Sequence, residues 1–121
     1  MTLARQELGK RGEELAVARL EREGYAILER RYRTRCGEID IVADDGGTLV
    51  FVEVKARADA EFGTAAEAIT PAKRRRVVRM AQDYLIRRGV ADRPCRFDVV
   101  AVMLGGAEPA VELFRSAFDA G

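Results

Sequence analysis

The pattern of hydrophobic and polar positions predicts an alternation of helices and strands along the whole chain. Leucine and alanine recur at helical spacing up to Gly24, which is a typical helix stop. Thr70 followed by Pro71 is a typical helix start, with the hydroxyl as cap and proline in the first helical position. The expected elements are a helix over residues 3–23, strands over residues 25–32, 37–43 and 49–57, an irregular stretch over residues 58–68 with a helical turn after Thr64, a helix from residue 71 that ends near Gly89, a strand over residues 96–104, a weaker strand over residues 110–114 and a terminal turn over residues 115–120.

This order of elements predicts an α/β fold, with a mixed central sheet flanked by helices. Residues 96–104 are nearly continuously apolar, as expected of a strand that is buried on both faces. The chain has 121 residues, of which 48% are hydrophobic, and this size is typical of one domain with a substantial core. We therefore expect a single domain over residues 1–121.

The strands over residues 37–43 and 49–57 are predicted to pair as a hairpin, because the glycines at 46–47 tolerate the positive φ of a two-residue turn. Counting back from this turn places Asp40 opposite Glu53, and a four-residue loop would slip the pairing by two without changing the faces. One face then carries Glu38, Asp40, Phe51, Glu53 and Lys55, and the other, which we expect to be the core side, carries Ile39, Ile41, Val50, Val52 and Val54.

Asp40 and Glu53 are the most informative pair on the polar face of this hairpin. Two carboxylates that face each other across a strand pair destabilise it unless a cation compensates. Lys55 is one candidate for this cation, and a divalent metal ion is the other. An ordinary surface charge ladder has the same spacing, so the pattern leaves both a metal site and a ladder open.

Composition restricts the chemistry further. The chain has no histidine, which excludes Ser-His-Asp triads, Cys-His dyads and histidine-ligated zinc. Lysine and arginine number 21 against 20 acidic residues, so any surface for nucleic acid must be a local basic patch. Cys36 and Cys95 stand singly and are interpreted as half-buried thiols. We find no signal peptide and no stretch that could span a bilayer, so we expect a cytoplasmic protein with no membrane partner.

Several short motifs are spread over almost the whole chain: Gly12-Glu13-Glu14-Leu15-Ala16, Gly24-Tyr25-Ala26-Ile27-Leu28, Gly37-Glu38-Ile39-Asp40, Phe51-Val52-Glu53-Val54-Lys55, Phe62-Gly63, Ile69-Thr70-Pro71, Arg96-Phe97-Asp98-Val99 and Ala117-Phe118. Together they resemble the bacterial YraN family, which in turn is similar to the PD-(D/E)xK nucleases and, among these, to the archaeal Holliday junction resolvases. The resemblance implies a restriction-endonuclease-like fold and a nuclease that acts on DNA. Ile39 stands where the superfamily has proline, a common variation that leaves the chemistry intact.

The resemblance also implies roles for individual residues. Carried over by position, Asp40 is the lone acid, Glu53 and Lys55 are the acid-x-lysine pair, and Glu13 is the acid on the first helix. Glu13 completes the site if this helix packs across the open end of the hairpin, and Glu14 is the alternative inward-facing acid.

Magnesium or manganese suits such a site, because a carboxylate-bound ion neutralises the charge of phosphodiester cleavage and lowers the pKa of water. The expected ligands are Asp40, Glu53 and the backbone carbonyl of Val54. Lys55 is expected to orient or polarise the attacking water, or to contact the scissile phosphate.

Several basic residues are candidates for contact with the phosphates of nucleic acid. They are Arg33, Arg35, Arg57, Lys73, Arg74 and Arg75, and Arg30 and Arg31 are further candidates beside them. A solvated helix face explains the run at residues 73–76 equally well. Glu38 and Asp98 are interpreted as structural residues that pair with nearby cations.

Three functional hypotheses remain from the sequence. The first is a Mg²⁺-dependent endonuclease that cleaves DNA, with branched or junction DNA as a candidate substrate. The second is a nucleic-acid-binding module that keeps the fold without turnover, and the third is a small interaction protein with a structural charge cluster. Resolvases of this kind act as dimers, so a homodimer is one alternative for the assembly, and the choice between DNA and RNA stays open.

Overall fold

The computed structural model describes residues 2–58 and 69–120 of the chain. The described residues form two helices and five strands in the predicted order. Their bounds are Thr2–Arg22 for α1, Ala26–Thr34 for β1, Gly37–Asp45 for β2, Thr48–Arg57 for β3, Pro71–Arg87 for α2, Cys95–Met103 for β4 and Ala110–Phe118 for β5. The irregular stretch expected up to residue 68, with its helical turn after Thr64, lies outside the described residues from residue 59 onward.

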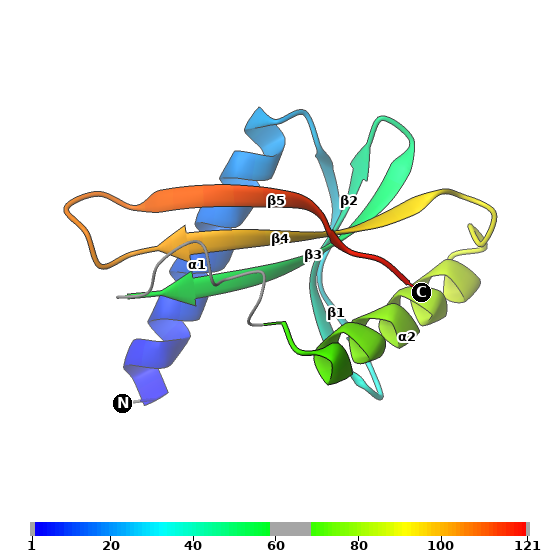
Figure 1. The fold of residues 1–121 in the computed structure, drawn as a ribbon, viewed down its shortest axis with the longest axis horizontal. Helices are drawn as coiled ribbons and strands as arrows, with labels where there is room; N and C mark the ends of the chain where they lie inside the picture. Colours follow the sequence, from blue (N-terminus) through cyan, green and yellow to red (C-terminus); the bar gives the residue numbers. More distant parts are fainter. Residues whose placement is uncertain (1, 59–68, 121) are drawn as a thin grey trace.

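The described strands form one mixed sheet in the order β1-β2-β3-β4-β5. All neighbours are antiparallel except β3 and β4, which run parallel and are connected through α2. One face of the sheet packs against α1 and the other against α2 (Figure 1). The predicted α/β fold is confirmed, and the arrangement is compatible with a restriction-endonuclease-like fold.

Both faces of the β2–β3 hairpin are buried, so the prediction of a single apolar core side was wrong. Phe51, expected on the polar face, is fully buried. The cluster toward α2 includes Ile39, Val42, Leu49 and Phe51, and the cluster toward α1 includes Ile41, Ala43, Val50 and Val52. The reason is that a helix covers each face, which the alternation within one hairpin does not reveal.

The turn of the hairpin agrees with the sequence. Gly46 and Gly47 have φ values of 61° and 102°, as a two-residue turn of this type requires. Asp45 pairs with Thr48, as predicted, and the ladder continues to Ile41 and Val52. Beyond Ile41, β2 stays paired with β1 but not with β3 in the described ladder. The sheet therefore opens between β2 and β3 at Asp40.

A close approach of α1 to β3 sets the position of the first helix. A Cβ atom at Gly12 would lie 2.5 Å from the Cβ of Ala56, a separation that real side chains do not reach. Only glycine fits here, and its absent side chain lets the helix backbone lie directly on the strand. As a result, the next residue, Glu13, is held near the open end of the hairpin. This is the position that its predicted role in the site depends on.

The other helix begins as predicted. Thr70 caps α2, since its hydroxyl accepts a hydrogen bond from the N–H of Lys73 at 3.2 Å, and Pro71 occupies the first turn.

The end of the chain differs from the prediction. Residues 115–118, expected in a terminal turn, continue β5. A register shift near Phe97 accommodates Ser116 at a φ of 53°, and the Ser116 N–H donates to Asp98 at 3.0 Å. Phe118 then stacks on Phe97 with ring centroids 5.0 Å apart. This tertiary stacking, which no local pattern shows, extends the strand.

Three further predictions concern single residues. Asp98 is fully buried and accepts hydrogen bonds from Arg96 at 2.9 Å and from the Tyr25 hydroxyl at 2.8 Å, so its structural role is confirmed. Cys36 and Cys95 are both exposed, so the prediction of half-buried thiols was wrong. Cys95 is the first residue of β4, and Cys36 directly precedes β2, so the sheet covers neither side chain.

Neither helix of the described chain is long and apolar enough to cross a membrane.

Candidate functional site

The opening between β2 and β3 is occupied by the side chain of Asp40. Its carboxylate accepts a hydrogen bond of 2.7 Å from the N–H of Val54, a backbone donor on the neighbouring strand. The side chain thereby replaces the missing ladder contact at this point and satisfies the Val54 N–H. Asp40 is consequently held in one orientation beside Glu53.

Glu53 is a buried acid with an incomplete set of partners. Its residue is only 4% exposed, and its Oε1 atom has no hydrogen-bond partner among the described residues. The other oxygen, Oε2, lies 3.9 Å from the Nζ atom of Lys73 in the first turn of α2. Buried polar atoms are nearly always paired, so an unpaired carboxylate oxygen here points to a proton or a cation that would share this position.

The two acids affect each other electrostatically. Burial, and next the charge of Asp40, raises the pKa of Glu53 from its ordinary value of 4.5 to about 8, against the attraction of Lys73 and Lys55. Burial also raises the pKa of Asp40, an effect that the Val54 hydrogen bond counteracts. Two adjacent carboxyl groups in a buried position favour holding one proton between them. They would release it in exchange for a cation.

Asp40 faces a cavity of about 670 Å³ at the open end of the hairpin. Lys55 lines the same cavity together with its neighbours Val54 and Ala56, whereas Glu53 does not line it, so strict alternation along β3 does not account for this lining. Charged residues from other elements contribute to its wall, among them Lys10 and Glu13 from α1 and Arg31 from β1. The cavity therefore combines three cationic side chains, Lys10, Arg31 and Lys55, with the carboxylates of Glu13, Glu38 and Asp40. Cations of this kind are suitable partners for a phosphate group.

Glu13, and not Glu14, is the inward-facing acid of α1, because Glu13 is 7% exposed and Glu14 is exposed. Glu13 is nevertheless engaged. Its Oε2 atom accepts a hydrogen bond from Arg30 Nε at 2.8 Å, and its Oε1 atom accepts one from Arg31 Nε at 3.0 Å. The geometry gives Glu13 the role of positioning two arginines beside the cavity, whereas Asp40 and Glu53 remain open to a cation.

Arg30 and Arg31 were candidates for phosphate contact from the sequence, but their pairing with Glu13 was not predicted. Arg31 has a φ of 56°, an uncommon conformation for a residue with a side chain. Strained residues of this kind concentrate at functional sites. Nothing in the local sequence indicates that Arg31 contacts Glu13, because the two residues are 18 positions apart.

The other six residues predicted to contact phosphates have different surroundings. Arg33 is paired with Glu38 at 3.1 Å, and Lys73 with Glu53, so both already have acidic partners. Arg57 lies half-buried at the end of β3 and is not among the described residues that line the cavity. The remaining three, Arg35, Arg74 and Arg75, make no ion pair within residues 2–58 and 69–120.

Two adjacent carboxylates at this site, those of Asp40 and Glu53, are candidates to bind a metal ion. In the part of the chain that the structure describes, no group of three or more histidine, cysteine, aspartate or glutamate side chains is arranged to hold a metal ion. Magnesium typically needs only one or two protein carboxylates, with water and phosphate oxygens as the other ligands. Asp40 and the unpartnered oxygen of Glu53 meet this requirement.

Comparison with known proteins places the chain in a family. The model of the uncharacterised protein family UPF0102 matches residues 12–102. The chain belongs to UPF0102. It is 50% identical over 115 residues to a UPF0102 protein of Anaeromyxobacter dehalogenans, which covers 95% of this chain and 86% of the relative. It is 49% identical over 120 residues to a UPF0102 protein of Moorella thermoacetica, which covers 98% of this chain and 100% of the relative.

UPF0102 is the YraN family, so the resemblance noted in the sequence is confirmed. The matched region contains the carboxyl pair, Lys55 and the whole of α2. The family is described as uncharacterised, and its description states no activity. The function of this UPF0102 member must therefore be argued from its site.

Proposed function

We propose that this UPF0102 member is a Mg²⁺- or Mn²⁺-dependent nuclease that cleaves DNA phosphodiester bonds, with branched and junction DNA as the first substrates to test. The observation that carries the proposal is the pair of Asp40 and Glu53 at the opening of the sheet. Glu53 is buried there with an oxygen that lacks a partner among the described residues, and Asp40 lines a cavity to which Lys10, Arg31 and Lys55 also contribute.

Asp40 and Glu53 are the residues that would hold the ion. When bound, the ion supplies a positive charge against the phosphate and lowers the pKa of water in its coordination shell. The Val54 N–H keeps the Asp40 carboxylate oriented. Burial on the sheet keeps the Glu53 side chain in place, so this part of the site needs little reorganisation on binding.

The cations around the cavity would bind the nucleic acid. Lys55 is placed to contact the scissile phosphate or to orient water, because it lines the cavity together with Asp40. Arg31, oriented by its hydrogen bond to Glu13, is placed to hold a phosphate oxygen. Removal of one such electrostatic contact typically lowers kcat by about 10²–10³.

Cleavage of defined DNA substrates tests this proposal. Wild-type protein with Mg²⁺ or Mn²⁺ should nick or cut linear, branched or single-stranded DNA, and EDTA should abolish the reaction. Asp40→Asn and Glu53→Gln should remove the carboxylates that bind the ion, and Lys55→Ala should lower the rate by about 10²–10³.

Matched control variants separate a lost site from a lost fold. Asp92→Asn and Glu112→Gln remove one exposed acid each, away from the cavity, and should leave the rate unchanged. Wild-type protein that is inactive on all three forms of DNA with both metal ions would contradict the proposal.

The second candidate function is nucleic-acid binding without turnover. It is favoured by the number of arginines on α2 that lack an acidic partner in the described chain. In that case, binding should survive Asp40→Asn, and no cleavage should appear with either ion.

A further inference from the structure

The first half of α2 carries a concentration of positive charge that the proposed site does not use. Five cations lie within residues 71–79, and the first turn contains no acid. Cations near a helix N-terminus oppose the helix dipole, and like charges four residues apart repel. Arg75 and Arg79 have this spacing. The helix would be more stable without them, so their presence calls for a partner outside the chain.

Arginines elsewhere in the chain are mostly paired with acids. Eight that lie on other elements or loops form ion pairs: Arg19, Arg30, Arg31, Arg33, Arg88, Arg93, Arg96 and Arg115. By contrast, Arg75, Arg76 and Arg79 are exposed and form no ion pair with any described residue. A net charge of only +1 is thus distributed unevenly, with a concentration of unpaired arginines on α2.

Three adjoining cavities follow these arginines around the helix. The first, of about 520 Å³, lies between α2 and the end of β5 and is lined by Arg74, Arg75 and Arg79. The second and third, of about 430 and 420 Å³, lie on the side of Cys36. Arg75 lines two of the three and Arg79 lines all three. The cavities therefore form one basic surface.

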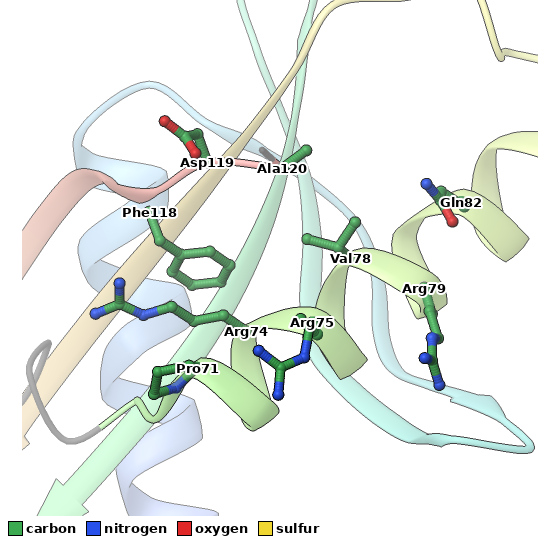
Figure 2. Close-up of a pocket in the computed structure, with 9 residues that line it drawn as sticks. All are labelled: Pro71, Arg74, Arg75, Val78, Arg79, Gln82, Phe118, Asp119 and Ala120. Atoms are coloured by element: carbon green, nitrogen blue, oxygen red, sulfur yellow. The ribbon is translucent and has the colours of Figure 1, made fainter.

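Arg74 is held in place within the first cavity. Arg74 Nε donates to the carbonyl of Ile69 at 2.9 Å, and its guanidinium lies 5.6 Å from the centre of the Phe118 ring. Figure 2 shows Arg74 extending under this ring, while Arg75 and Arg79 project from the same side of α2. Asp119, the acid of this cavity, lies at the end away from Arg79 (Figure 2).

The spacing along α2 fits a chain of phosphates. Arg75 and Arg79 are four residues apart, or about 6 Å along the helix axis. One strand of a duplex advances by about 3.4 Å per phosphate, so the two arginines span about two phosphates. Nucleic-acid interfaces are polar and strongly positive, whereas the core of a protein interface is apolar. Arg74, Arg75, Arg79 and Gln82 in the lining of the first cavity match the former, although Val78 and Phe118 add apolar area.

We infer that Arg75, Arg76 and Arg79 form a second contact surface, which binds the sugar–phosphate backbone of duplex nucleic acid away from the scissile bond. The inference rests on the proposed function for the identity of the ligand. Lys73 connects the two surfaces, since it lies in the same helix and 3.9 Å from Glu53. The substrate is then a duplex or a duplex arm that reaches beyond the carboxyl site, and short oligonucleotides would bind weakly.

Binding measured without turnover tests this inference. The probe is a fluorescent DNA duplex of about three helical turns, titrated in EDTA at several salt concentrations and followed by anisotropy. We expect the double variant R75Q/R79Q to bind at least tenfold more weakly at low salt. The slope of log K against log salt should also fall by about 2, since each lost phosphate contact removes about 0.9.

Two control proteins define the comparison. R11Q/R22Q removes the same charge from two exposed arginines of α1, which line none of the three cavities, and should keep the wild-type slope. R75K/R79K keeps the charge and should retain most of the slope. Its affinity should be lower, because lysine lacks the planar guanidinium that binds a phosphate through two N–H groups. R75Q/R79Q relieves repulsion within α2, so its melting temperature should not fall.

Several results would overturn the inference: R75Q/R79Q with the affinity and slope of R11Q/R22Q, wild-type protein that binds no DNA or RNA duplex, or tighter binding to an acidic peptide than to either duplex. The outcome is separable from that of the cleavage assay. If no DNA is cut but binding depends on these arginines, only the nuclease proposal fails. If DNA is cut and the arginine variant binds like the control, only the second surface fails.

Discussion

Individual acids in this chain have different environments although they look alike in the sequence. Glu53 is buried next to Asp40 and lacks a partner for one oxygen among the described residues, whereas Glu38 is neutralised by Arg33 and Glu13 by Arg30 and Arg31. A buried carboxylate with one unpartnered oxygen is costly to keep charged, even though Lys73 lies 3.9 Å from its other oxygen. This cost makes Glu53 the most informative residue for a test of the site.

The stability of the metal-free protein should depend on pH through Glu53. The folded state holds the Glu53 proton up to a pKa of about 8, and the unfolded chain releases it near 4.5. Between these values the folded state binds more protons, so stability is fully present below pH 4.5 and is lost as pH rises toward 8. The expected loss is roughly 1 kcal/mol per pH unit.

Thermal unfolding in EDTA from pH 5 to pH 9 measures this effect for wild type and Glu53→Gln. The variant should have a flatter profile and become the more stable protein at high pH, because glutamine stays neutral. Glu112→Gln, which changes an exposed acid, should follow the wild-type curve. Parallel curves for wild type and Glu53→Gln would show that Glu53 does not hold a proton in the folded state.

Helices and strands are placed in this fold by a few close contacts. The approach of α1 to β3 depends on Gly12, where an added Cβ would lie 2.5 Å from Ala56. Three residues earlier, Gly9 has open space around it in the described structure. The two glycines of one helix thus have opposite roles, which the sequence does not distinguish.

Replacing each glycine by alanine should reveal this difference. Gly9→Ala should stabilise the protein by about 0.5–1 kcal/mol through helix propensity. Gly12→Ala gains the same propensity but forces α1 away from β3, and overpacking typically costs about 1–3 kcal/mol, so it should be destabilising overall.

Denaturant unfolding of both variants measures these changes, with the slope m as a check that the unfolded states are comparable. Equal stabilisation by the two substitutions would mean that α1 does not lie as close to β3 as described. Because Glu13 follows Gly12 directly, Gly12→Ala should also displace the arginines that Glu13 holds.

In the molecule as a whole, the two helices cover opposite faces of the sheet, and the site lies where β2 and β3 separate. α1 contributes Glu13 and Lys10 to the cavity, while α2 brings Lys73 to Glu53. Every layer of the fold therefore supplies part of the site. Binding of a cation at the carboxyl pair should stabilise the complete fold, and not only the hairpin.

Titration with Mn²⁺ should therefore raise the stability of the wild-type protein. At a metal concentration of 100 times Kd the expected gain is about 2.7 kcal/mol, or on the order of 10 °C in melting temperature. Calorimetry near pH 7 should show proton release on binding, because the ion displaces the shared proton. Glu53→Gln and Asp40→Asn should lose both effects.

Glu112→Gln serves again as the control and should bind Mn²⁺ as wild type does. A melting temperature of wild-type protein that neither Mg²⁺ nor Mn²⁺ changes would identify the carboxyl pair as purely structural.

The order of elements, the Gly46–Gly47 turn and the Thr70 cap were predictable from the amino-acid sequence, because each depends on neighbours within a few residues. The proximity of Asp40 and Glu53 was also predictable, because a two-residue turn sets the register of the β2–β3 hairpin that carries them.

Contacts between distant parts of the chain decided the rest. Burial of both sheet faces depends on where α1 and α2 pack, and the extension of β5 depends on stacking of Phe118 on Phe97. Glu13 was a candidate from the sequence, but its pairing with Arg30 and Arg31 requires a helix and a strand to meet. Local patterns carry no information on such distances. Only the tertiary structure therefore distinguishes Glu53, with its unpartnered oxygen, from Glu13 and Glu38, which arginines neutralise.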